Sequence, residues 1–223
     1  MYINKREVEQ QVEKFSESPN IWTLADGELY NLCEKYPDHK NTEQVIAKLW
    51  FIGRTYAATL ERRRNAKATT DELYENAAKA MCGFLDERLG VTKGKTDAFA
   101  EMLELHNDLA KSFIIESETK NAAIKRSLAS KYLHFHCRDK FYIYDSNAES
   151  AISKLVSKRK KSNWEEIDIG EYESKVPENV DNVYCNFCLR AVALHKYLNN
   201  KNLTVKQLDN FLLFVQKNYS AKK

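Results

Sequence analysis

The sequence predicts an all-α fold of about nine helices, and three observations support this prediction. Glycine and proline are scarce, with 6 Gly and 3 Pro among 223 residues, which favours long helices over many short strands. Hydrophobic residues make up 43% of the chain and aromatic residues 11%, which is enough for a sizeable core. Apolar residues also recur three and four positions apart along most of the sequence, the spacing of amphipathic helices.

This spacing places the helices in order along the chain. Their expected ranges are 4–17, 23–35, 41–64, 70–89, 96–115, 121–136, 146–161, 180–199 and 204–219. Residues typical of helix boundaries agree, since Thr69 and Thr204 stand at helix starts and Gly90 follows a helix end. The aromatic and β-prone residues 141–144 predict a short extended link that leads to Asp145.

We expect residues 1–223 to form a single helical domain. Two polar connectors, at 91–95 and 162–179, could mark where lobes meet. Residues 1–95 and 96–223 could then form separate lobes with a cleft between helical groups.

The sequence also indicates a cytoplasmic protein. No apolar run approaches the roughly 18 residues that span a bilayer, and residues 1–17 are charged throughout. Five scattered cysteines argue against a disulfide framework and for a reducing compartment. Cys185 and Cys188 have the spacing of half a zinc site or a redox pair, but they also lie on an apolar helix face, where they would be core residues. We expect no metal and no cofactor.

Positive charge is concentrated in one part of the chain. The formal net charge is +3, yet residues 120–161 contain eleven Lys or Arg against three Asp or Glu. Such a block is typical of a surface that contacts phosphates, although it is also compatible with solvated helix faces. The candidate DNA-binding residues are Lys125, Arg126, Arg138, Lys140, Lys154, Lys158 and Lys161.

The segment from Ser127 to Asp145 carries the residues most suited to chemistry. On a helix, Ser127, Lys131 and His134 share one face, beside an apolar stripe. A lysine that is partly desolvated on such a face is expected to have a lowered pKa, which makes its neutral amine available as a nucleophile. Asp145 directly precedes the next helix, where it or Ser146 could be a simple N-cap, but a carboxylate held there could also be catalytic.

Three segments of the sequence resemble a known enzyme family. "SLASKYLHFH" and "FYIYDSNA" are similar to the second helix and catalytic aspartate of 8-oxoguanine glycosylases in the helix-hairpin-helix superfamily. They resemble in particular a bacterial 8-oxoguanine-glycosylase-like group, some of whose members are proposed to act against phages with modified bases. "AKLWFIGRTYAATLERR" at 47–63 fits the same group. The resemblance implies a DNA glycosylase in which Lys131 and Asp145 are catalytic.

Two features depart from the better-known members of this family. Their nucleophilic lysine corresponds to the position of Ser127, whereas Lys131 lies one helical turn later on the same face. Their glycine-rich hairpin has no counterpart, because residues 116–121 contain no glycine.

The resemblance implies a reaction on double-stranded DNA. The enzyme would flip a modified nucleotide out of the duplex, and Lys131 would attack C1′ to form a Schiff base that can lead to strand cleavage. Asp145 would stabilise the transition state, and His134 or His136 could transfer a proton or contact phosphate. We expect a monomer. Candidate stacking residues for the extruded base are Tyr132, Phe141, Tyr142, Tyr144 and Phe187.

Other interpretations stay open at the level of sequence. His134 and His136 could suggest a metal pair, but residues two apart on a helix point in different directions. Arg54, between apolar residues, is expected to be buried and to pair with a core acid or, alternatively, with substrate. The chain could also be a non-catalytic nucleic-acid-binding module, or a helical scaffold for a protein partner.

Overall fold

The computed structural model describes residues 10, 21–61, 68–114, 124–156, 169–198 and 203–219. These residues form ten helices and no strand, which confirms the all-α class. The chain divides into two compact units, an N-terminal unit that ends at Phe141 and a C-terminal unit that begins at Tyr142. The lobe boundary expected at residues 95 and 96 lies inside the N-terminal unit. None of the helices in the described ranges is long and apolar enough to cross a membrane.

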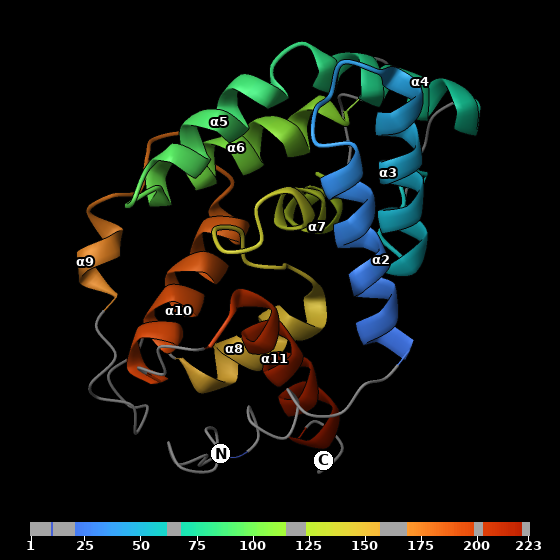
Figure 1. The fold of residues 1–223 in the computed structure, drawn as a ribbon. Coiled ribbons are helices and arrows are strands. Elements are labelled where there is room, and N and C mark those ends of the chain that lie inside the picture. Colours follow the sequence, from blue (N-terminus) through green and yellow to red (C-terminus); the bar gives the residue numbers. More distant parts are fainter. Residues whose placement is uncertain are drawn as a thin grey trace. The chain divides into compact units, whose positions relative to one another are not determined.

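The N-terminal unit is built around one central helix. Its helices are α2 (Ile21–Lys35), α3 (Thr42–Thr55), α4 (Thr70–Cys82), α5 (Leu85–Gly94), α6 (Phe99–Ser112) and α7 (Arg126–His136). Figure 1 shows α7 with α2 and α3 on one side and α6 on another, and α7 contacts all three. All nine residues from Leu128 to His136 are buried. A helix that is buried around its whole circumference places polar side chains in the core as well as apolar ones.

Local signals fix where these helices begin. Asn41 caps α3, because its side chain accepts a hydrogen bond from the backbone N–H of Gln44 at 3.1 Å. Thr69 and Glu72 form a capping box at the start of α4, each accepting from the other's backbone N–H. Such caps satisfy N–H groups that have no partner within the helix.

Two expected helices are shorter than the periodicity indicates. The helix expected over 41–64 ends at Thr55, and the chain turns through Ala57, whose φ is 50°. Gly53 permits this return, because a Cβ there would lie 3.3 Å from the Thr59 Cα. The helix expected over 70–89 is divided at Gly83 and Phe84 into α4 and α5.

The C-terminal unit packs three longer helices together. They are α8 (Ser146–Leu155), α10 (Asn182–Leu198) and α11 (Val205–Tyr219), and α8 contacts both of the others. A short α9 (Gly170–Glu173) lies in the expected connector. Residues 142–144 belong to neither a helix nor a strand, and the Tyr184 hydroxyl donates to the Tyr142 carbonyl at 2.9 Å. Cys185 and Cys188 are buried in α10.

Some expected segments lie outside the residues that the structure describes. Apart from Gln10, the helix expected over 4–17 lies outside the described residues. The glycine-free segment 116–121 also lies outside them. So do residues 157–161, the last part of the helix expected over 146–161.

Candidate active site

Lys131 lies in the middle of α7, and only 1% of its surface is exposed. Its Nζ donates a hydrogen bond to the Ser127 Oγ at 2.8 Å, one turn earlier on the same helix. Nζ also lies 5.5 Å from the centroid of the Tyr56 ring, which comes from the turn after α3. The amine is therefore held by a hydroxyl within its own helix and by an aromatic ring from another segment.

Tyr56 is itself held by a carboxylate that the sequence analysis did not single out. Its hydroxyl donates to the Asp26 Oδ1 on α2, and Asp26 is buried. Asp26, Tyr56 and Lys131 thus bring α2, the end of α3 and α7 to one place in the N-terminal unit. Tyr56 is 30 positions from Asp26 and 75 positions from Lys131 in the sequence. No helical periodicity links residues so far apart, so the sequence contained no signal that these three side chains would meet.

His134 has a different set of partners from Lys131. The Tyr30 hydroxyl lies 2.6 Å from its Nε2, and its Nδ1 lies 2.9 Å from the Phe141 carbonyl oxygen. The ring is fully buried, and both of its nitrogens take part in these hydrogen bonds. His134 therefore joins α2, α7 and the chain after α7.

Tyr132 and His136 lie in a second buried cluster. The ring centroids of His136 and Tyr132 are 5.0 Å apart, and the His39 centroid lies 4.6 Å from that of His136. Lys48 lies beside them, with Nζ 5.9 Å from the Tyr132 centroid. The His39 Nδ1 is 2.6 Å from an Asp86 carboxylate oxygen. The buried residues His39, Lys48, Tyr132 and His136, together with the partly exposed Asp86, form what we call the buried polar cluster.

Burial controls ionisation in the buried polar cluster. Desolvation, together with the nearby Lys48 charge, lowers the pKa of His39 to about 4. The same two causes hold the pKa of His136 well below its ordinary value. Desolvation also lowers the pKa of Lys48, whose Nζ donates to the Tyr36 and Asp38 carbonyls at 2.9 and 3.0 Å. Both histidines are therefore neutral near pH 7.

The two histidines of the H-x-H sequence do not converge. His134 contacts Tyr30 and the Phe141 carbonyl, whereas His136 contacts His39 and Tyr132. Within the described ranges, no group of three or more His, Cys, Asp and Glu side chains is arranged to hold a metal ion.

Asp145 is the N-cap of α8 in the C-terminal unit. Its Oδ1 accepts hydrogen bonds from the backbone N–H groups of Asn147 at 2.9 Å and Ala148 at 2.8 Å. Of the two capping candidates, Asp145 rather than Ser146 fills the position. These bonds orient the carboxylate at the start of the helix. Tyr144 is half-buried, and its ring meets that of Phe187 edge-on with centroids 5.4 Å apart.

Arg54 is not buried, which corrects the sequence-based expectation. Its side chain is 50% exposed and forms an ion pair with Glu61. The guanidinium carbon lies 4.2 Å from the centroid of the Trp50 ring, which is also exposed. The expectation failed because the apolar neighbours Trp50 and Phe51 are themselves on the surface of α3.

Four of the candidate DNA-binding residues belong to the N-terminal unit, at opposite ends of α7. Lys125 and Arg126 are at its start, and Arg138 and Lys140 follow its end. Because α7 has 11 residues, the two helix ends that carry these pairs are about 16 Å apart. Arg138 is paired with Glu34 at 3.4 Å, and Lys140 donates to the Lys95 carbonyl at 2.9 Å.

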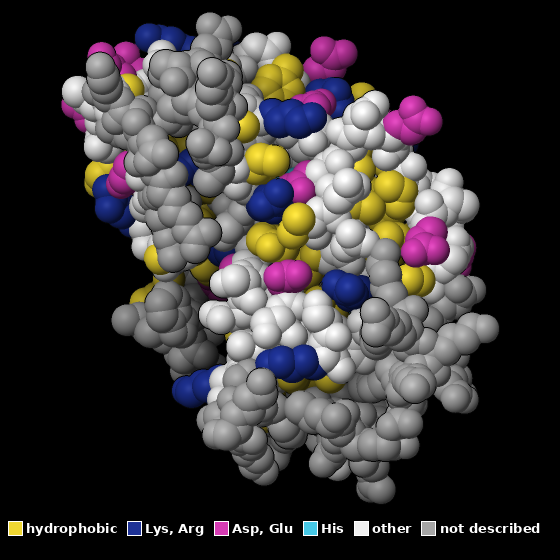
Figure 2. Space-filling model, turned by 180° about the vertical axis from the view of Figure 1, so that it is seen from behind, with side chains coloured by type: hydrophobic (Ala, Val, Ile, Leu, Met, Phe, Trp, Pro, Cys, Tyr) yellow, Lys and Arg dark blue, Asp and Glu magenta, His cyan; other side chains and the backbone are white. Residues whose placement is uncertain are grey.

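The remaining candidates are in the C-terminal part of the chain. Lys154 is exposed on α8 and donates to Gln216 of α11 at 2.9 Å. Lys158 and Lys161 lie outside the described residues. On the face drawn in Figure 2, Lys and Arg side chains lie among Asp and Glu side chains rather than in one uninterrupted basic patch.

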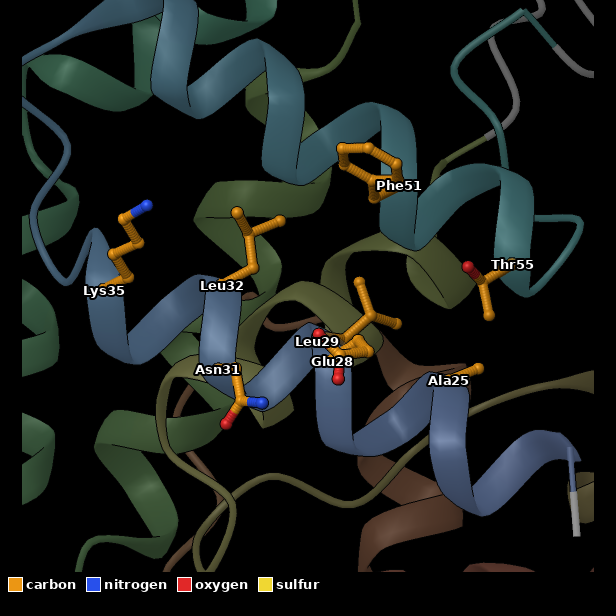
Figure 3. A pocket seen from close by; sticks show the side chains of 8 residues that line it. All are labelled: Ala25, Glu28, Leu29, Asn31, Leu32, Lys35, Phe51 and Thr55. Carbon is orange, nitrogen blue, oxygen red and sulfur yellow. The ribbon is translucent and has the colours of Figure 1, made fainter.

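A pocket of about 490 Å³ lies between α2 and α3 (Figure 3). Its lining residues are Ala25, Glu28, Leu29, Asn31, Leu32, Lys35, Phe51 and Thr55. Phe51 is 55% exposed and stands at the α3 side of the pocket. Ala25 and Thr55 immediately precede Asp26 and Tyr56, so the same two segments line the pocket and carry the pair beside Lys131. The volume is within the range of small-molecule sites, about 300–1,000 Å³.

The chain was compared with protein-family models, with curated proteins and with solved structures, and none of the three comparisons finds a match.

Proposed function

We propose that the protein is a DNA glycosylase that excises a damaged or modified base and uses Lys131 as its nucleophile. The observation that carries this proposal is the environment of the Lys131 amine, which is removed from bulk water and held by Ser127 and the Tyr56 ring. A desolvated amine in a fixed position is what nucleophilic catalysis by lysine requires. The sequence likeness of the segment 127–145 to 8-oxoguanine glycosylases supports the same assignment.

The proposed reaction begins at C1′ of an extruded nucleotide. The lone pair of the neutral Lys131 Nζ forms a bond to C1′, while the bond from C1′ to the base nitrogen breaks and its electron pair leaves with the base. A proton lost by the amine balances the charge on the departing base. The Nζ lone pair then expels O4′, which takes a proton from water, and leaves a protonated Schiff base between Lys131 and the opened sugar.

Asp145 has the role of an electrostatic partner in this proposal. Its carboxylate is oriented by two backbone N–H groups at the start of α8, and the resemblance to 8-oxoguanine glycosylases assigns to it the stabilisation of the positive charge that develops on the sugar. Because hydrogen bonds of this kind fix the side chain before reaction, little reorganisation is needed during the step.

Base release from modified duplexes tests the proposal. A panel would include 8-oxoguanine, alkylated bases and hypermodified cytosines of the kind found in phage DNA, each in an end-labelled duplex. We expect base release or strand nicking on at least one duplex, and its loss in Lys131→Gln with DNA binding largely retained. Lys111→Gln, which removes an exposed lysine of α6, is the matched control and should remain active.

The opposite result would identify a different class of protein. Folded wild-type protein that binds every duplex in a salt-dependent manner, yet releases no base from any, would contradict the glycosylase and favour a non-catalytic nucleic-acid-binding module.

A further inference from the structure

The Tyr56 ring lies beside the amine of Lys131 and is held from behind by a carboxylate. The distance of 5.5 Å from Nζ to the ring centroid is within the range of cation–π interactions, which is about 6 Å. The Tyr56 hydroxyl is the donor of a hydrogen bond to Asp26. Since hydrogen bonds polarise the groups they join, donation to a carboxylate increases the electron density of the phenol ring.

Hydrogen bonds on both sides of Tyr56 fix the conformation of its backbone. The Tyr56 N–H donates to the Ile52 carbonyl at 3.1 Å, and the Ala58 N–H donates to the Gly53 carbonyl at 2.8 Å. Ala57 between them has a φ of 50°, a left-handed conformation that residues with a Cβ seldom adopt. Such a conformation persists only where the surrounding contacts fix it. The turn therefore holds the Tyr56 ring in a defined position.

We propose that Tyr56 and Asp26 are a positioning pair for Lys131, in which the ring held by Asp26 stabilises positive charge as it develops on Nζ. The inference rests on the proposed function, because the charge in question is that of the attacking amine and of the protonated Schiff base. Ser127 contacts Nζ through its Oγ and the ring contacts it through its π face. The amine is thereby directed between two fixed groups from different segments.

A duplex with a single abasic site tests this pair without any assumption about the target base. Nζ adds to the C1′ aldehyde, water leaves, and the resulting protonated Schiff base is reduced by cyanoborohydride to a stable secondary amine. The measured quantity is the rate constant for formation of this covalent adduct as a function of pH. At the high-pH plateau the amine is neutral, so the rate depends on stabilisation of the charge that develops during attack.

We expect Tyr56→Leu to lower the plateau rate by between about 2-fold and 30-fold, the range of a single cation–π contact. The midpoint of its pH–rate profile should move to lower pH, because loss of the ring removes a stabilising contact of the ammonium form. Tyr56→Phe keeps the ring but removes the hydrogen bond to Asp26, and Asp26→Asn keeps an acceptor but removes its negative charge. Both should show smaller changes in the same direction. These two variants keep the test decisive if the leucine variant does not fold.

Tyr74→Phe is the matched control. Tyr74 also donates to a carboxylate, Glu61, at 3.1 Å in the N-terminal unit, and its removal should leave plateau and midpoint unchanged. Suppose that the wild-type protein forms the adduct and that folded Tyr56→Leu shows the wild-type plateau rate and the wild-type midpoint. This result would overturn the positioning pair but leave the proposed function intact. A lower plateau with an unmoved midpoint would also overturn it, in favour of a structural role. Absence of any adduct with wild-type protein would instead remove the proposed function on which the pair rests.

Discussion

The substitution His39→Asn tests whether the buried polar cluster makes stability depend on pH. The pKa of His39 is about 4 in the folded protein, against an ordinary value of 6.5. Below pH 6.5 the unfolded chain takes up a proton that the folded protein does not, so the free energy of unfolding falls as the pH falls from 6.5 towards 4. Above about pH 7 both states are neutral and the contribution is fully present.

These two pKa values set the size of the effect. Each pKa unit corresponds to about 1.4 kcal/mol, so the full difference is about 3 kcal/mol, and about 2 kcal/mol of it is lost between pH 8 and pH 5. Asparagine cannot titrate, but its side-chain N–H can replace the His39 Nδ1 in the bond to Asp86. His136 is present in both proteins, and the variant keeps its burial and the nearby Lys48 charge, which are the two largest causes of its lowered pKa.

Urea unfolding of both proteins at pH 8 and pH 5 measures this quantity. Between the two pH values, wild-type protein should lose about 2 kcal/mol more of its unfolding free energy than His39→Asn does. Equal losses in the two proteins would refute the reasoning, because they would mean that His39 titrates alike in the folded and unfolded states.

Three further substitutions test other contacts. Thr69→Ala removes the capping box of α4 and should lower the unfolding free energy by about 1 kcal/mol, measured by urea unfolding at pH 8. Lys48→Ala leaves a cavity and two loop carbonyls without their donor, so we expect a loss of about 3 kcal/mol; Lys40→Ala, at an exposed position, should cost almost nothing. Arg126→Gln should reduce the slope of log affinity for DNA against log salt by about 1, whereas Lys111→Gln should not change it, and an unaltered slope in the arginine variant would exclude Arg126 from the DNA surface.

Local chemistry made much of the fold predictable from the sequence. The expected helix over 23–35 corresponds to α2, and the one over 204–219 corresponds to α11 to within two residues at each end. Periodicity and capping residues carry this information because they act within a few residues. The early end of α3 was not predictable, since it depends on the close approach of Thr59 to Gly53, which no local pattern records.

Around the candidate nucleophile, too, the sequence predicts contacts within one helix but not contacts between helices. The contact between Lys131 and Ser127 follows from their spacing of four on a helix. The Tyr56 ring and the Asp26 carboxylate reach the site from other helices, and the partner of His134 on α2 lies 104 residues away in sequence. Such placements result from tertiary packing, and a single sequence does not contain them.

Arg54 illustrates a different failure. Apolar neighbours in a helix suggested a buried guanidinium, but exposed aromatic side chains are common on protein surfaces. Here the exposed Trp50 ring covers the Arg54 guanidinium from one side, and Glu61 balances its charge. Composition around a residue therefore did not determine its burial.

The most direct test of the central claim is to find which residue bonds to DNA. Wild-type protein is incubated with an active modified duplex and borohydride, and the reduced adduct is digested and mapped by mass spectrometry. We predict a single modified side chain, Lys131, and no adduct with Lys131→Gln. An adduct on any other lysine, or base release that proceeds without a trappable adduct, would contradict Lys131 as the nucleophile.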